Sequence, residues 1–268
     1  LSLPVHLPFE ERQRHARLDK LTTHVANTLI ERYWTPEHLT GIDEYSYQAW
    51  KYFDESEAFA DVEHYLPSRY KRCVMQKVGE TLRSHADKRE AFQSIQSVLP
   101  DHKIRRIHTR RIKNQLWDSE EYIKSGYVDV LIGQLNSYYD RHGRFPESYF
   151  EMQECPTYSN GALPYSADDG PTSGQAVKYE YGKDMQTLTV KLKTPDTVEP
   201  ETHGDWTWTK HELKGYEAFD ELLEHGSLSA PSFQPTQTKT GDKYHELSFP
   251  VEVEHEEKPD DIETVLAI

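Results

Sequence analysis

Cysteine is nearly absent from this chain, and long apolar runs are missing. Among its 268 residues, Cys73 and Cys155 are the only cysteines, and they lie too far apart in sequence to form a Cys-x-x-Cys pair. This spacing excludes a disulfide framework and a cysteine-rich zinc site. The apolar runs are far shorter than the roughly 20 residues that cross a bilayer. No charged segment followed by an apolar one marks a signal peptide. We therefore expect a cytoplasmic protein that has no membrane partner.

Motifs for self-contained catalysis are also missing. The sequence has no glycine-rich nucleotide loop, no HExxH zinc motif and no GxSxG nucleophile motif. Its 14 histidines are mostly scattered, and we interpret them as structural or surface groups. Cys73 lies beside basic residues that can activate a thiol, but its apolar neighbours Val74 and Met75 favour a packed side chain. The sequence thus specifies no catalytic residue and no metal ligand.

Apolar residues are few and acidic residues are many. Hydrophobic residues make up 35% of the chain, whereas aromatic residues reach 12%, which is enough to build a packed core. Asp and Glu number 46 against 31 Lys and Arg, so the formal net charge is −15. Such an excess of carboxylates keeps a protein soluble and repels nucleic acid. It also suits a high-salt cytoplasm.

Two basic segments interrupt this acidity. The first basic segment, residues 66–77, contains no acid, and the second basic segment, residues 101–114, has six Lys or Arg residues and one acid. Positive charge gathered in an acidic chain indicates a polyanionic partner, and the alternative is a helix face laced with salt bridges. The candidate nucleic-acid-binding residues are Arg69, Tyr70, Lys71, Arg72 and Lys77 in the first segment, and Lys103, Arg105, Arg106, His108, Arg110, Arg111, Lys113 and Asn114 in the second. Four of them can stack on bases or bond to base edges: Tyr70, Arg72, His108 and Asn114.

The first 150 residues have mostly helical periodicity. Apolar residues at helical spacing predict a helix from about Phe9 to Trp34, where Pro36 ends it. Further helices are predicted over residues 45–53, 68–97 and 123–140. Residues 1–7 alternate between apolar and polar or Pro positions, which predicts an edge strand.

The second half of the chain has strand patterns. Residues 155–174 are rich in Pro, Gly, Ser and Asn and predict a loop. Residues 175–181 and 185–192 predict a hairpin, and residues 232–238 and 244–254 predict another. Trp206 and Trp208 alternate with polar residues in the manner of a strand. Residues 214–225 predict a short helix, and residues 263–268 a buried strand.

Residues 239–254 read Lys-Thr-Gly-Asp-Lys-Tyr-His-Glu-Leu-Ser-Phe-Pro-Val-Glu-Val-Glu, and an acidic linker and the strand ending at Ile268 follow them. Before them come an N-terminal strand, the sequence Phe9-Glu-Glu-Arg12 and a long helical insertion. This order resembles the N-terminal half of the TnpB family, the transposon-encoded RNA-guided DNA endonucleases related to type V CRISPR effectors. The acidic bias is similar to that of a haloarchaeal version.

The resemblance implies an α+β fold. Residues 1–8 and 155–260 would form a β-barrel wedge domain, residues 9–154 a helical recognition lobe, and residues 261–268 a linker and the start of a RuvC-like strand. It implies guide RNA and double-stranded target DNA as partners, together with a C-terminal nuclease half. The magnesium and structural zinc of the family belong to that half, so we expect no cofactor and no DNA cleavage from this chain alone. Since the chain lacks an N-terminal Met and stops in an apolar run, we expect a piece of a longer polypeptide or a truncated one.

Three alternatives stay open. A natural homologue that kept guide and DNA binding but lost cleavage would act as an RNA-guided regulator. An acidic interaction protein without a nucleic-acid role would carry its basic segments as salt-bridged surface. A stand-alone hydrolase would need a site that the sequence does not reveal.

Overall fold

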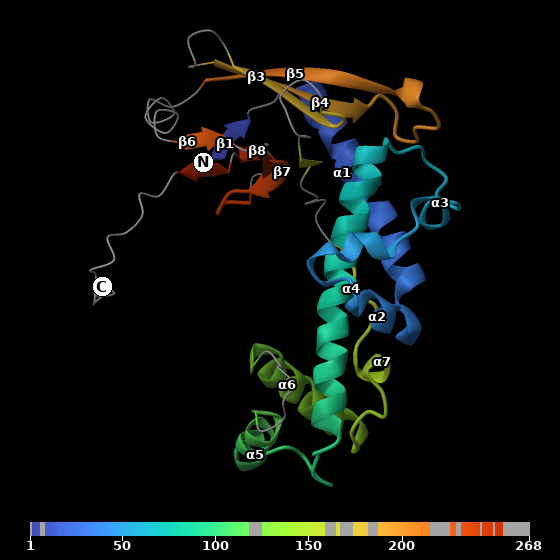
Figure 1. Cartoon of the computed structure of the whole chain (residues 1–268), viewed down its shortest axis with the longest axis vertical. Coiled ribbons are helices and arrows are strands. Elements are labelled where there is room, and N and C mark those ends of the chain that lie inside the picture. Colours follow the sequence, from blue (N-terminus) through green and yellow to red (C-terminus); the bar gives the residue numbers. More distant parts are fainter. Residues whose placement is uncertain are drawn as a thin grey trace, which may run out of the picture. The chain divides into compact units, whose positions relative to one another are not determined.

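The computed structural model of this chain describes residues 2–5, 9–117, 125–158, 165–166, 174–181, 187–214, 226–228, 232–241, 243–248 and 250–253. These residues form a mixed α+β fold in which one short N-terminal strand precedes the helices and the other strands follow them (Figure 1). The predicted helix over residues 214–225 and the predicted strand over residues 263–268 fall outside the described residues, apart from Lys214, which ends a strand.

The chain divides into two compact units. Unit 1 comprises Leu1–Thr23, Val62–Cys73 and Asn160–Ile268, and unit 2 comprises His24–Asp61 and Val74–Ser159. The division passes through two long helices, α1 (Phe9–Tyr33) and α4 (Ser68–Gln96). The compact units thus place the first turns of both helices with the strands. The wedge and recognition-lobe boundaries implied by the resemblance remain a prediction.

Unit 2 is built from helices. It holds the C-terminal parts of α1 and α4, together with α2 (Pro36–Asp43), the 3-10 helix η1 (Ser46–Tyr52), α3 (Glu55–Ala58), α5 (Arg106–Trp117), α6 (Ser125–His142) and α7 (Tyr149–Met152). The helix predicted over residues 45–53 is a 3-10 segment with a kink at Gln48. Helices α2, α3 and α7 are too short for their periodicity to stand out in the sequence.

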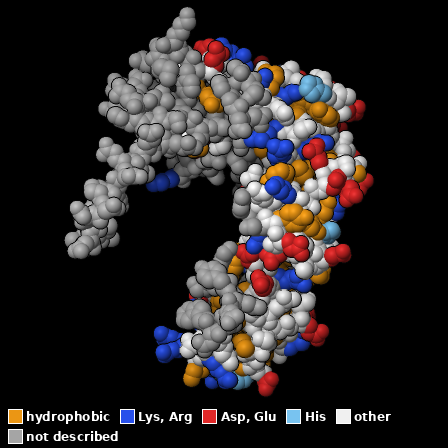
Figure 2. All heavy atoms as spheres, viewed as in Figure 1, with side chains coloured by type: hydrophobic (Ala, Val, Ile, Leu, Met, Phe, Trp, Pro, Cys, Tyr) orange, Lys and Arg blue, Asp and Glu red, His pale blue; other side chains and the backbone are white. Residues whose placement is uncertain are grey.

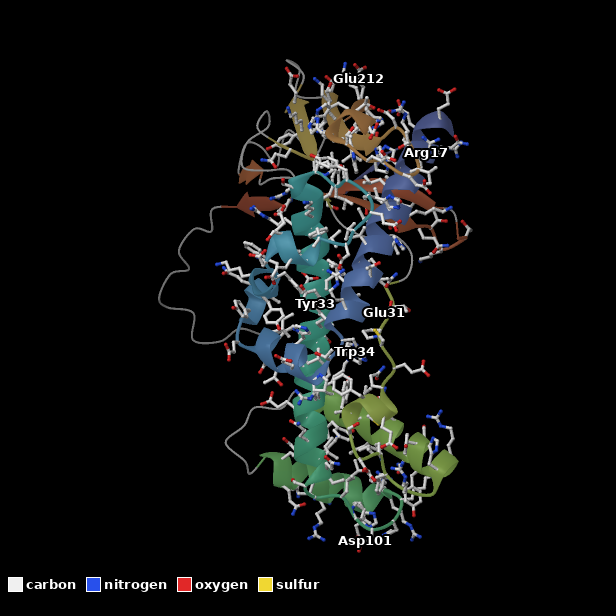
Figure 3. All side chains as sticks on the ribbon, turned by 90° about the vertical axis from the view of Figure 1, so that its right-hand side faces the viewer. Arg17, Glu31, Tyr33, Trp34, Asp101 and Glu212 are labelled. Carbon is white, nitrogen blue, oxygen red and sulfur yellow. The ribbon has the colours of Figure 1, made fainter. Side chains whose placement is uncertain are left out.

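The predicted ends of the two long helices are confirmed. Helix α1 stops at Tyr33 because Pro36 follows closely, and the Thr35 side chain then caps α2 by accepting the backbone N–H of His38. Trp34, labelled in Figure 3, packs edge-on against His85 at a ring distance of 4.9 Å. Cys73 on α4 is buried, as predicted for a packed cysteine.

Unit 1 carries three antiparallel sheets. The described strands are β1 (Ser2–Val5), β2 (Tyr165–Ser166), β3 (Val177–Tyr181), β4 (Thr187–Pro195), β5 (Trp206–Lys214), β6 (Gly226–Leu228), β7 (Ser232–Gln237), β8 (Lys243–Ser248) and β9 (Val251–Val253). They are ordered β1-β8-β7-β2, β3-β4-β5 and β6-β9. Within the described strands each sheet is open, so the closed wedge barrel remains a prediction.

Both predicted hairpins are confirmed, with one correction. Strand β3 pairs with β4 and strand β7 with β8, and β1 lies at a sheet edge beside β8. The single strand expected over residues 244–254 is instead two strands, since β8 pairs with β7 while β9 pairs with β6. Pro250 separates them, because proline cannot donate a ladder hydrogen bond. The loop expected over residues 155–174 contains the short strand β2.

Helix α1 meets two of these sheets through a histidine cluster. The His15 ring on α1 lies 5.4 Å from that of His211 on β5 and 4.7 Å from that of His245 on β8. Glu11 and Asp19, one helical turn before and after His15, approach His211 and His245 at 2.9 Å and 3.4 Å. Burial, followed by the two neighbouring histidines, lowers the pKa of His15 to about 2. Burial, followed by His245, lowers the pKa of His211 to about 4.

These low pKa values predict that unit 1 loses stability as the pH falls below about 6.5. The unfolded chain binds protons on these histidines before the folded chain does, so stability is full above the unfolded pKa and declines below it. His211 alone contributes on the order of 2 kcal/mol of loss at pH 5. Burial raises the pKa of Glu11, so the folded chain binds a proton there before the unfolded chain does, which opposes part of this loss.

Urea unfolding between pH 7.5 and pH 5, followed by circular dichroism, measures this loss. His142→Gln is the control, because it removes one exposed histidine of α6, in unit 2, and leaves the histidine cluster of unit 1 intact. A free energy of unfolding that is constant over this range would contradict the prediction.

Candidate nucleic-acid interface

The first basic segment is divided between the two units. Residues up to Cys73 belong to unit 1, and Lys77 belongs to unit 2. Arg72 is exposed, whereas Arg69 and Lys71 are half-buried. The Lys77 ammonium bonds to Glu80 at 3.3 Å and lies 5.8 Å from the centre of the Tyr158 ring. This segment therefore does not present its cations as one face of a single unit.

Tyr70 corrects the sequence interpretation. Its side chain is fully buried, and its ring stacks on Trp206 with ring centres 5.2 Å apart. Its hydroxyl donates a hydrogen bond to the backbone carbonyl of Lys193. A ring enclosed in this way has no face for a base to stack on, so the proposed role of Tyr70 in nucleic-acid contact is wrong. Because the residues next to Tyr70 in the sequence are polar, the sequence pattern did not indicate that Tyr70 is a core residue.

The second basic segment leads into α5 of unit 2 and supplies the residues of that helix up to Asn114. Ile112 and Leu116, one turn apart on α5, are buried together with Ile104. They pack into a core that also contains apolar residues of α6, among them Val128, Leu131, Ile132 and Leu135. Figure 1 shows α5 beside α6. Because one face of α5 is held against this core, the opposite face is directed to solvent.

The chain entering α5 is fixed by one amide side chain. The Oδ1 atom of Asn136 on α6 accepts the backbone N–H of Ile104 at 3.0 Å. Its Nδ2 atom donates to the Ile104 carbonyl, also at 3.0 Å. This reciprocal pair imitates one rung of a β-ladder and sets where α5 begins. At that point the Nδ1 atom of His108 accepts the backbone N–H of Arg105.

Two of the six cations of the second basic segment are neutralised by α6. The Lys103 ammonium lies 2.5 Å from a carboxylate oxygen of Asp140. The Lys113 ammonium lies 2.6 Å from a carboxylate oxygen of Asp129. Both pairs are at least partly open to solvent, so each adds little stability. For these two lysines, the salt-bridged alternative describes the structure well.

The remaining four cations are arginines, and they differ from the two lysines in their lack of an acidic partner among the described residues. Arg105, Arg106, Arg110 and Arg111 are all exposed, and none of them forms a salt bridge with another described residue. We call these four side chains the arginine face. Asn114 is exposed one turn beyond Arg110 and Arg111. Ile107, among the arginines, is 74% exposed. Figure 2 shows blue Lys and Arg side chains gathered over α5.

The arginine face opposes the stability of its own helix. Arg106 is the first residue of α5, and the first turn has no acidic residue. Cations at a helix N-terminus meet the positive end of the macrodipole, at a cost of about 0.3–1 kcal/mol each. Arg106 and Arg110 are also like charges at i and i+4, which adds a cost of about 0.2–0.5 kcal/mol. The arrangement disfavours the isolated helix and favours the approach of an anion.

His108 is placed as a local structural group. Its ring lies 4.8 Å from that of His102 in an edge-on arrangement, and its Nδ1 atom is used at the start of α5. Asp101, labelled in Figure 3, immediately precedes His102. Contact of His108 or Asn114 with bases remains a prediction. Exposed Ile107 was not singled out by sequence, because an isoleucine in a helical pattern is normally read as core.

Metal binding and membrane insertion find no support in the described ranges. Across these residues, no group of three or more His, Cys, Asp or Glu side chains is placed to hold a metal ion. No helix among them is both long and apolar enough to span a bilayer.

Asn136→Leu should loosen the entry to α5. The substitution keeps the side-chain volume similar but leaves both the N–H and the C=O of Ile104 without their partner, at a cost of about 1–3 kcal/mol. Thermal unfolding measures the loss, and hydrogen exchange should show faster exchange of the Ile104 amide. Ser137→Ala is the control, since the Ser137 hydroxyl donates to the Gly133 carbonyl within its own helix, α6. Equal stability of both variants would show that Asn136 does not fix this entry.

No family model matches the sequence, and no curated protein matches it. A function for this chain therefore rests on its own residues.

Proposed function

We propose that this chain binds nucleic acid through the arginine face, as the guide-RNA and target-DNA binding portion of an RNA-guided endonuclease similar to TnpB. The observation that carries the proposal is the set of four exposed arginines, three on α5 and Arg105 directly before it, that form no salt bridge with described residues. The chain as a whole has a net charge of −15, so acidic residues to neutralise them are plentiful. Among the described residues, Lys103 and Lys113 have such partners, and the four arginines do not.

Arginine suits this role because its guanidinium is always charged and presents its N–H groups as a planar fork. That fork matches two oxygens of a phosphate. Four such groups on about one and a half helical turns can follow a phosphate backbone and supply sequence-independent affinity. The exposed amide of Asn114 lies beside them and has the donor and acceptor pair that recognises an adenine edge.

The relation to TnpB is part of the same proposal. Strand β1 pairs with β8, which lies within the segment 239–254 that is most similar to the family. The two are joined by a long insertion that is largely helical. Both features are compatible with a wedge domain interrupted by a recognition lobe. In this proposal, cleavage belongs to a RuvC-like domain that holds magnesium and zinc, and residues 1–268 supply recognition. A nuclease-dead homologue acting as an RNA-guided regulator would use the same surface.

A second candidate function is an acidic interaction protein with no nucleic-acid role. The pairs Lys103–Asp140 and Lys113–Asp129 favour it, because they make part of the second basic segment an ordinary salt-bridged face. In that case the arginine face would meet carboxylates of a protein partner. The two candidates differ in whether the bound polymer carries phosphates.

Replacing all four arginines of the face with Gln should weaken RNA binding across sequences. Each lost phosphate contact lowers the slope of log Kd against log salt by about 0.7 for a single strand and about 0.9 for a duplex. Loss of four contacts therefore lowers the slope by about 3. The measurement is fluorescence anisotropy of a labelled 30-nucleotide RNA and of a duplex DNA, at several salt concentrations.

The control variant carries the same change of charge at four exposed cations elsewhere: Lys20, Lys51, Arg141 and Lys239, each replaced by Gln. Its salt slope should stay near that of the original chain. If the two quadruple variants bind RNA and DNA equally well, the arginine face is not the binding surface. Circular dichroism of both variants establishes that α5 is retained. Purification from the native host with sequencing of bound RNA would then identify the guide.

A further inference from the structure

Three lysines lie in one row across the sheet β3-β4-β5. Lys178 is directly opposite Lys191, and Lys191 is directly opposite Lys210. Residues opposite each other on antiparallel strands point to the same face, with their Cβ atoms about 5 Å apart. The alternate residues Val190, Leu192 and His211 are buried on the other face, where His211 meets Glu11 of α1. The row therefore lies on the face of the sheet that is turned away from α1.

A tryptophan and a fourth lysine adjoin this row. Trp208 and Lys193 form the next opposite pair along the sheet. The Lys178 ammonium lies 4.7 Å from the centre of the Trp208 ring, a cation–π distance. The Lys193 ammonium lies 2.7 Å from Nε2 of His203. Burial, and then the nearness of Lys178, lowers the pKa of Lys193. Trp208 is 37% exposed, and the Lys178 ammonium lies over its ring.

The charges on this face are only partly balanced. Lys210 pairs with Glu212 at 2.8 Å, and Figure 3 labels Glu212 at this sheet. The neighbouring row, on the side of the lysines away from Trp208 and Lys193, consists of Glu180, Thr189 and Glu212. Among the described residues, Lys178 and Lys191 form no salt bridge. Like charges placed directly opposite each other destabilise a sheet. In a chain of net charge −15, such a row is a local reversal of sign.

We infer that this face, defined by Lys178, Lys191, Lys210 and Trp208, binds a single-stranded nucleic acid. Phosphates would bind along the lysine row, which crosses the strands, and a base would stack on Trp208. When a phosphate attracts the Lys178 ammonium, the ring face that this ammonium now covers becomes available. A positive surface combined with an aromatic face is the general means of holding single strands.

The aromatic ring decides between the anionic partners that this surface fits. An anionic membrane or an acidic peptide would satisfy the lysines, but a lipid surface offers no flat ring to stack on Trp208, and a peptide offers one only where it has an aromatic residue. A duplex keeps its bases stacked on each other and offers only its backbone. A single strand supplies both the phosphates and the exposed bases. The inference extends the proposed function to a second surface, on unit 1, and does not depend on the arginine face of unit 2.

The test uses the full chain and a fluorescein-labelled 20-nucleotide oligouridylate at low salt. Lys178→Gln with Lys191→Gln should weaken binding about tenfold or more and lower the salt slope by about 1.4. The matched control is Lys20→Gln with Lys239→Gln, two exposed lysines of unit 1 that lie outside the row. Trp208→Ala should lose at least about fivefold in affinity, whereas Trp208→Phe should retain most of it because the stacking face is kept.

Each variant is also made in the chain that lacks all four arginines of the arginine face. Residual binding there that depends on Lys178, Lys191 and Trp208 supports the inference even if the arginine face proves inactive. The inference would be overturned if the affinities of the lysine variant and of its control lay within twofold of each other. If binding were lost only on replacement of the four arginines, the proposed function would still stand. Binding to phosphatidylserine vesicles but not to oligouridylate would also overturn it. Thermal unfolding verifies that every variant is folded.

Discussion

The burial of Ile112 and Leu116 against α6 is the constraint on which the candidate interface depends. These two side chains fix the rotation of α5 about its own axis, and Asn136 fixes where the helix begins. With both set, the four arginines of the arginine face are exposed, and none of them forms a salt bridge with another described residue. An anion-binding surface built on a packed helix is better defined than one on a loop, because the core supplies the ordering that a ligand would otherwise have to impose.

The acidity of the chain is compatible with the proposed binding of nucleic acid because the charge is distributed unevenly. Acids of α6 neutralise the lysines at the two ends of the second basic segment, Lys103 and Lys113, and leave the arginines. On the sheet β3-β4-β5, Glu212 pairs with Lys210 and leaves Lys178 and Lys191. The same pattern occurs on an α-helix and on a sheet. In both, some of the positive groups pair with an acid and others form no salt bridge with a described residue, so that the unpaired ones would attract an anion to that surface.

Helix and strand positions were largely predictable, whereas the identity of surface residues was not. Periodicity located α1, α4, β3 and β4 because their apolar side chains repeat at the spacing of one buried face. The alternating pattern predicted one strand over residues 244–254, which is wrong after Pro250, where the partner strand changes from β7 to β6. The interpretation of Tyr70 as a stacking residue was wrong because its burial comes from Trp206 and Lys193, more than 100 positions away.

By itself, the sequence determined that this chain is acidic, that its first half is helical and its second half stranded, and that positive charge gathers in residues 101–114. Each of those properties depends only on the residue types present and on residues that are close together in the sequence. Only the tertiary structure decided which cations are neutralised, since Asp129 and Asp140 reach α5 from another helix. It also decided that Lys178, Lys191 and Lys210 form a row, because strand register joins residues that have no common local pattern.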